Sequence, residues 1–118
     1  MKIDELSVKE IWKEIAVQAD EHPEHFQGIT ATYVVTVKTK EGEENNTLII
    51  NDGTYEIKED AADNADCTLS LNENNFKKLL QGNLNTTTAF MTGKLKVKGN
   101  IGLALKLEQT LKKFSFQE

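Results

Sequence analysis

"MTGKLKVKGNIGLALKLEQTLKKF", residues 91–114, is the stretch of sequence that decides the fold. Its first part alternates lysines with Leu95 and Val97, which is the period of two of a half-buried strand. Gly99 and Asn100 follow, and asparagine is a favoured residue at a helix N-cap. We therefore expect a strand over about 94–98 that passes directly into a helix ending near Lys113.

This final helix is more apolar than a surface helix requires. At about 100° per residue, its apolar side chains spread over an arc of roughly 200°, whereas a surface helix needs a stripe of about 100° or a little more. The excess lies in the first turn, with Ile101, Leu103, Ala104 and Leu105. Two interpretations stay open: a helix wedged between the sheet and another helix, or a helix with one side facing an apolar cavity.

The rest of the chain supplies the other elements of the fold. Ser7 and Glu10 form a capping box at the start of an amphipathic helix. A period of two begins at Ile29, and Asp52-Gly53 is a strong hairpin signal. Further strands are expected at about 29–38, 46–51, 54–58 and 67–71, and short helices after Asn72 or Asn74 and after Asn85. This order predicts an α+β fold, with a five-stranded, mainly antiparallel sheet covered on one face by about four helices.

Length and composition narrow the class of protein. A chain of 118 residues is expected to form a single domain, residues 1–118. It contains no apolar run near the roughly 20 residues that cross a bilayer, and its start does not resemble a secretion signal. The single cysteine, Cys67, excludes an internal disulfide. Together these features favour a cytoplasmic protein.

Charge is unevenly distributed along the chain. The net charge is −5, but residues 94–113 hold six lysines against one acidic residue, Glu108. The sequence contains no arginine, which disfavours a nucleic-acid partner because arginine is the usual reader of phosphate and guanine. Lys94, Lys96 and Lys98 share one face of a strand. They form either a solvated sheet edge or a docking surface for anionic headgroups or a membrane.

Residues that carry catalysis or bind metals show no convincing pattern. His22 and His25 form an H-x-x-H pair that lacks the two further ligands of a zinc site, so we interpret them as surface histidines. Cys67 alternates with Leu69 and Leu71, as a small buried residue does, and no base for a nucleophile is evident. The sequence has neither a G-x-S-x-G nor a G-x-G-x-x-G motif. We therefore expect no enzyme activity.

One long segment resembles a known family. "DCTLSLNENNFKKLLQGNLNTTTAFMTGKLKVKGNIGLALKLEQTL", residues 66–111, closely resembles the second half of the sterol carrier protein type 2 (SCP2-like) domain. The shared features are a short helix that ends at Gly82, the Phe90-Met91 pair, and the block from Gly93 to Asn100. "HPEHFQGITATYVVTV", residues 22–37, is similar to the first helix-to-strand passage of that family.

This resemblance implies a fold and a site. Members of the family bind fatty acids, fatty acyl-CoA, sterols and other long lipids in an apolar tunnel between sheet and helices, without a metal or redox cofactor. Carried over to this sequence, the residues implied to line the tunnel are Phe76, Leu80, Leu84, Phe90, Met91, Leu103, Leu107 and Leu111. The implied partners are a long-chain lipid and, transiently, an anionic membrane surface, with the chain a monomer or a homodimer.

The sequence thus predicts non-catalytic binding or transfer of a long-chain lipid. The alternative is a small interaction or dimerisation scaffold whose core is filled by side chains and binds no lipid. A small thioester hydrolase is a third hypothesis, which only the family's association with acyl-CoA supports, because no nucleophile-base pair is present.

Overall fold

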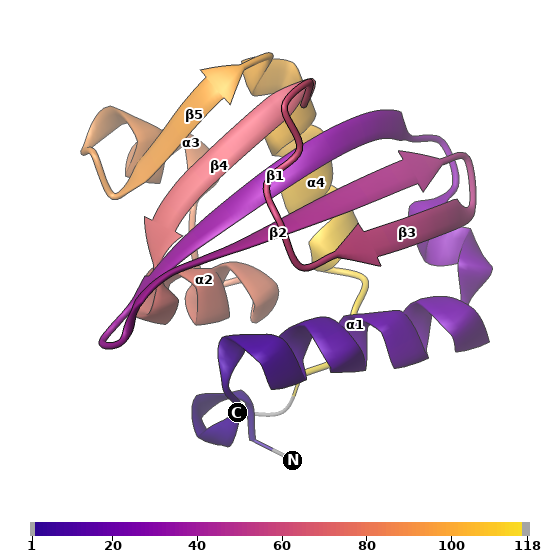
Figure 1. The fold of residues 1–118 in the computed structure, drawn as a ribbon, viewed down its shortest axis with the longest axis horizontal. Helices are drawn as coiled ribbons and strands as arrows, with labels where there is room; N and C mark the ends of the chain where they lie inside the picture. Colours follow the sequence, from indigo (N-terminus) through magenta and orange to yellow (C-terminus); the bar gives the residue numbers. More distant parts are fainter. Residues whose placement is uncertain (1, 117–118) are drawn as a thin grey trace.

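Five strands form one sheet in the order β3-β2-β1-β4-β5 (Figure 1). The computed structural model describes residues 2–116. The strands are β1 (Thr30–Thr39), β2 (Gly42–Asn51), β3 (Thr54–Lys58), β4 (Cys67–Asn72) and β5 (Leu95–Gly99). The helices are α1 (Val8–Glu21), α2 (Glu73–Leu80), α3 (Thr86–Met91) and α4 (Ile101–Leu111), with short 3-10 turns at Ile3–Glu5 and Pro23–Phe26. The expected α+β fold and order of elements are confirmed.

Side-chain caps fix where the helices begin. The Ser7 hydroxyl accepts a hydrogen bond from the Glu10 N–H at 3.1 Å, and the Glu10 carboxylate accepts one from the Ser7 N–H at 2.9 Å, which completes the predicted capping box. Asn72, Asn85 and Asn100 cap α2, α3 and α4, each with its side-chain oxygen accepting hydrogen bonds from backbone N–H groups of the first turn. None of the helices within residues 2–116 has the length and apolarity needed to cross a bilayer.

Three of the four strand pairs are antiparallel, as expected, and one is parallel. β1 pairs with β2, β2 with β3, and β4 with β5 in antiparallel register, whereas β1 and β4 run parallel. The parallel pair arises because residues 59–66 cross the sheet from β3 at one edge to β4 on the far side of β1 (Figure 1). The sheet is therefore mixed rather than purely antiparallel.

The two faces of the sheet differ in chemistry. On β1, Tyr33, Val35 and Val37 belong to the apolar core that the helices complete; we call this the core face. The alternate residues Thr32, Val34 and Thr36 lie on the opposite side, which we call the open face. β4 and β5 extend the same alternation: Leu69 pairs with Val97 on the core face, and Ser70 pairs with Lys96 on the open face.

Residues 59–66 cover the part of the open face formed by β1 and β2. The Thr47 hydroxyl donates to the Asp60 carbonyl at 2.7 Å and accepts from the Ala62 N–H at 2.9 Å. Thr47 and Val34 are consequently buried although they lie opposite the helices. The β4–β5 part of the open face keeps its lysines in solvent.

Candidate functional site

Most of the residues implied to line a tunnel meet in the core between the sheet, α2 and α4. Phe76, Leu80, Leu107 and Leu111 are almost completely buried, and Leu84 is buried at its edge. They belong to one cluster with the core-face residues of β1 and β4, and Leu103 packs against that cluster while half-buried. The sequence thus identified side chains that lie together, although they are distributed over two helices and a loop.

Phe90 and Met91 lie elsewhere. Both are exposed at the C-terminal end of α3, and Met91 shows 79 % of its surface to solvent. The six-residue α3 buries Thr86 and Ala89 instead, because only one side of so short a helix can face the core. The Phe90-Met91 pair therefore faces solvent and does not join the other six residues.

The buried members of the set lie in a single apolar cluster that α1 and the sheet complete. The Trp12 and Phe76 rings lie 5.8 Å apart between α1 and α2. At the other end of the core, the Tyr33 hydroxyl donates to the Leu103 carbonyl at 2.9 Å and so attaches α4 to the sheet. The tunnel that the resemblance implies is not shown within residues 2–116, where these side chains belong to one buried apolar cluster.

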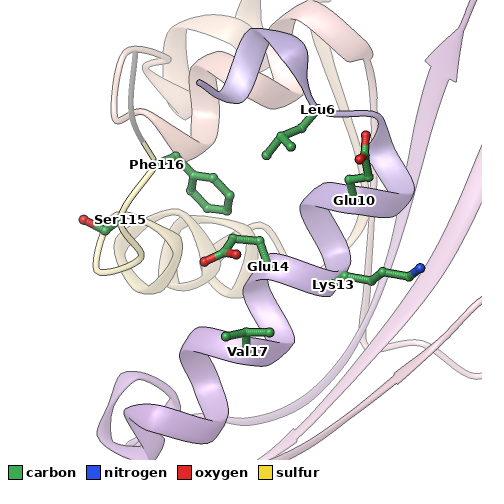
Figure 2. A pocket seen from close by; sticks show the side chains of 7 residues that line it. All are labelled: Leu6, Glu10, Lys13, Glu14, Val17, Ser115 and Phe116. Carbon is green, nitrogen blue, oxygen red and sulfur yellow. The ribbon is translucent and has the colours of Figure 1, made fainter. Parts of the chain in front are cut away.

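One hollow lies outside the core, between α1 and the segment that follows α4. Its volume is about 460 Å³. Figure 2 shows Val17 and Glu14 of α1 with the Phe116 ring opposite Leu6. Gln18 holds the two walls together, because its side-chain amide donates to the Ser115 carbonyl and accepts from the Ser115 N–H, both at 2.7 Å. None of the residues that the sequence nominated lines this hollow.

Lys94, Lys96 and Lys98 stand exposed on or beside the edge strand β5. Lys96 and Lys98 pair with Ser70 and Thr68 on the open face. Within residues 2–116 none of these three lysines forms an ion pair with a carboxylate. Lys94 and Lys96 also border a hollow of about 330 Å³ that Lys38, Ser70 and Asn72 help to line, together with Leu71, Asn75 and Gly93. Its lining has three lysines and no acidic residue.

His22, His25 and Cys67 take part in packing and hydrogen bonds and show no arrangement suited to metal binding or catalysis. His22 accepts or donates a 3.0 Å hydrogen bond with Glu24, and its ring stacks on His25, which packs edge-on against Phe114. The part of the chain that the structure describes contains no group of three His, Cys, Asp or Glu side chains suited to a metal ion. Burial raises the pKa of the Cys67 thiol to about 11, whereas a nucleophilic cysteine needs a lowered pKa.

Two residues with special environments were not nominated from the sequence. Glu108 is buried and accepts hydrogen bonds from the Thr86 N–H at 2.8 Å and from the Thr86 hydroxyl, so that α4 holds the start of α3. In the sequence, Glu108 is a charged residue within the apolar arc of the final helix, and this position could have indicated a buried carboxylate. Trp12 is buried and its indole N–H has no partner, which the helical spacing of its neighbours does not reveal.

The fold and the arrangement of helices define an SCP2-like α+β domain. The family model described as the SCP-2 sterol transfer family matches residues 12–112, and the chain belongs to that family. Sterol carrier protein 2 from Rattus norvegicus is 34 % identical over 101 residues, which are 83 % of this chain and 18 % of that protein. The chain thus spans about a fifth of the length of this relative.

Solved structures of the family have the same fold. The apo form of sterol carrier protein 2 from Yarrowia lipolytica matches with a TM-score of 0.64 at 36 % identity, over 83 % of this chain and 79 % of that one. Sterol carrier protein-2 like-3 from Aedes aegypti matches with a TM-score of 0.70 over 92 % of this chain and 98 % of that one. Its 15 % identity supports the fold alone.

Proposed function

We propose that this protein is a non-catalytic carrier that binds and transfers a long-chain lipid. The observation that supports the proposal most directly is the family match over residues 12–112. The relatives named sterol carrier protein 2 support the general class of ligand, and the apolar layer between the sheet, α2 and α4 supplies the chemistry. Fatty acids, fatty acyl-CoA, sterols and isoprenoid-like lipids are all compatible with an apolar site.

We propose that the ligand enters the layer of apolar side chains and separates α4 from the sheet. The residues proposed to contact it are Phe76, Leu80, Leu84, Phe90, Met91, Leu103, Leu107 and Leu111, of which Phe90 and Met91 would have to turn inward. Each methylene moved from water into such a site gains about 0.8 kcal/mol, or around 12 kcal/mol for a 16-carbon chain before ordering costs. Micromolar binding needs about 8 kcal/mol net, so roughly 4 kcal/mol of the gross gain is left to offset ordering of the ligand and opening of the core.

Native mass spectrometry of the protein as purified tests this proposal. A carrier is expected to retain a lipid, which extraction then identifies, and to take up a fluorescent fatty-acid analogue after delipidation. Leu103→Gln should weaken that uptake, because Leu103 is half-buried against the core, whereas Val17→Gln on the exposed side of α1 should not. If neither retained lipid nor uptake is found with folded protein, the carrier function is refuted.

Lys94, Lys96 and Lys98 are proposed to contact an anionic membrane during transfer. A lysine near an anionic bilayer contributes about 1 kcal/mol, so replacing Lys94, Lys96 and Lys98 with Gln should weaken binding to anionic vesicles by on the order of 100-fold. A matched variant changes the exposed Lys40, Lys58 and Lys78 to Gln, which alters the net charge equally. Equal losses in both variants, or equal binding of wild type to neutral vesicles, would remove the docking role.

Exposed apolar residues also support a second candidate, the interaction scaffold. Phe90, Met91, Ile101 and Leu105 present apolar surface on α3 and α4 that a second protein could cover. Light scattering coupled to size-exclusion chromatography distinguishes the candidates. A tight dimer without bound lipid indicates the scaffold, and a monomer or dimer with bound lipid indicates the carrier.

A further inference from the structure

The hollow bordered by Lys94 and Lys96 lies on the open face, where β1 and β4 end and β5 begins; we call it the lysine hollow. Strand register brings its residues together. Lys38 pairs with Asn72 across β1 and β4, and Ser70 pairs with Lys96 across β4 and β5. Lys94 directly precedes β5. Backbone pairing thus holds three lysines and two polar side chains at one end of the sheet.

No carboxylate within residues 2–116 forms an ion pair with the lysines of this hollow. Glu43 lies opposite Lys38 on β2, yet the two are not paired. An adjoining hollow contains Asp4 and Glu73, and Glu73 is already paired with Lys77 at 3.0 Å. The lysine hollow therefore concentrates three positive charges on a protein whose net charge is −5. A local field of this sign attracts anions.

Asn75 gives a second, independent indication of a ligand. It is only 8 % exposed and lies in the first turn of α2, which directly follows β4 (Figure 1). Its backbone N–H donates to Asn72 Oδ1 at 2.8 Å, but its side-chain amide forms no hydrogen bond within residues 2–116. Side-chain amides this deeply buried normally have a partner.

The Asn75 amide is also accessible from the lysine hollow. Trp12 Nε1 is the only unpaired side-chain nitrogen or oxygen of the buried residues within 2–116 that is sealed from solvent, so the amide atoms of Asn75 are not sealed. Asn75 lines the lysine hollow, as does the half-buried Ser70. An unpaired, accessible amide beside three lysines points to a ligand that binds from outside the chain.

A phosphate monoester matches this set of groups. It carries a charge of about −1.5 to −2 at pH 7 and has three terminal oxygens that accept hydrogen bonds. Lysine binds phosphate as a point charge, and hydrogen bonds to charged oxygens are stronger than those between neutral groups. A carboxylate or a phosphodiester carries a single negative charge and leaves more of the lysine charge unbalanced.

We propose that the lysine hollow binds a phosphate monoester, either a free ester or the headgroup of a lipid. Its three lysines balance the charge, and the Asn75 amide and the Ser70 hydroxyl donate hydrogen bonds to the phosphate oxygens. The inference goes beyond the proposed carrier function, because the hollow lies on the open face and the apolar layer on the core face. It also differs from general attraction to an anionic membrane, because it includes Lys38 and Asn75 and leaves out Lys98.

NMR titration of the isotope-labelled protein with methyl phosphate tests the inference. We expect saturable shifts of the backbone amides of Ser70, Asn75 and Lys96. Dimethyl phosphate and acetate, each with one negative charge, should bind about 10-fold more weakly at the same ionic strength. Lowering the pH from about 7.5 to about 5 should weaken the binding of methyl phosphate, because the ester takes up a proton with a pKa of about 6. Dimethyl phosphate has no such proton, and its binding should not change in this way.

Single substitutions separate the hollow from the rest of the charged surface. Lys38→Gln and Lys96→Gln should each weaken the binding of methyl phosphate by about 3–10-fold, because each removes one charged donor. Asn75→Ala should weaken it by about 3-fold without a change of charge. Lys98→Gln is the charge control, because Lys98 lies on the same face of β5 as Lys96 without lining the hollow. Asn74→Ala, exposed in the same turn of α2, is the control for Asn75, and each control should change binding by less than about 2-fold.

Vesicles distinguish the two sources of the phosphate group. Phosphatidylcholine vesicles receive equal mole fractions of phosphatidic acid, a monoester, or of phosphatidylglycerol, a diester. Tighter binding to phosphatidic acid that Asn75→Ala abolishes assigns the site to a lipid headgroup. Saturable binding of methyl phosphate together with equal binding to the two kinds of vesicle assigns the site to a free ester.

Two results would overturn the phosphate site. They are equal binding of methyl phosphate and dimethyl phosphate, and equal losses in Lys96→Gln and Lys98→Gln, because both describe diffuse attraction to a charged surface. Uptake of the fluorescent fatty-acid analogue is measured in Lys38→Gln and Asn75→Ala and should be unchanged, because neither residue belongs to the apolar cluster.

The two readouts separate this inference from the carrier function. If phosphate binding is absent and lipid uptake persists, the phosphate site is wrong and the carrier function stands. If methyl phosphate binds as expected and no lipid is retained or taken up, the carrier function is refuted and the phosphate site stands.

Discussion

The two halves of α4 differ in which side chains they expose and which they bury. In the N-terminal half, Ile101 is 43 % exposed and Leu105 38 % exposed, although both are large and apolar. In the C-terminal half, the helix buries Glu108 and Thr110 beside Leu107 and Leu111. The N-terminal half of this helix thus leaves apolar side chains in solvent, whereas the C-terminal half buries polar ones.

This difference in burial distinguishes residues that stabilise the fold from residues that a binding partner could contact. The buried polar group of the C-terminal half has a structural task, because Glu108 binds the N-terminal end of α3. The exposed apolar groups of the N-terminal half have no such task within the described residues, since the sheet and the other helices leave them in solvent. Apolar surface of this kind often marks a binding site.

Truncating one leucine in each half gives the largest expected contrast. Leu107→Ala removes a fully buried side chain and should lower the free energy of unfolding by about 2–5 kcal/mol. Leu105→Ala, two residues away, should cost about 1 kcal/mol or less, because its side chain is 38 % exposed and does not belong to the core cluster. Urea denaturation measures both values. Similar losses would show that the two halves are equally part of the core.

Glu108 provides the next largest effect. Glu108→Ala leaves the Thr86 N–H and hydroxyl without their acceptor and should cost about 1–3 kcal/mol of unfolding free energy. Glu108→Gln keeps one acceptor oxygen and should cost less. Gln109→Ala is the control, because this neighbour is exposed. A Glu108→Ala variant as stable as the control would contradict a structural role for the buried carboxylate.

Much of this fold was predictable because its signals are local. The capping box at Ser7, the asparagine caps and the Asp52-Gly53 turn each act within a few residues of sequence. The parallel pairing of β1 with β4 was not predictable in this way. It depends on the path of residues 59–66 across the sheet, which no local propensity specifies.

The candidate site was predictable in its buried part only. Periodicity and family resemblance together identified Phe76, Leu80 and Leu107, because apolar positions on helices converge on a common core. The exposure of Met91 depends on how few turns α3 has, and the unpaired N–H of Trp12 depends on three-dimensional neighbours. The spacing of residues along the chain predicts neither property.

Tyr33 links the N-terminal half of α4 to the sheet. Its replacement is expected to have the smallest effect on the free energy of unfolding, and this effect depends on pH. Tyr33→Phe removes the hydrogen bond to the Leu103 carbonyl and should cost about 1 kcal/mol of unfolding free energy at neutral pH. Burial also raises the pKa of Tyr33 to about 12, above the value of 10 for an unperturbed tyrosine. The fold therefore favours the neutral phenol, so this stabilisation is complete below pH 10 and is lost as the pH rises through 12.

Wild type should consequently lose more stability than Tyr33→Phe between pH 10 and pH 12, and the two curves should converge. Tyr55, whose pKa is raised to about 12, is present in both proteins, so its contribution cancels in the difference. The Cys67 thiol, whose pKa is raised to about 11, also raises the pKa of Tyr33 through its charge and is therefore part of the difference. Urea denaturation at several alkaline pH values provides the measurement. Parallel curves across this range would mean that the fold does not hold Tyr33 in its neutral form. Curves that coincide at neutral pH as well would mean that the hydrogen bond to Leu103 adds nothing to the attachment of α4.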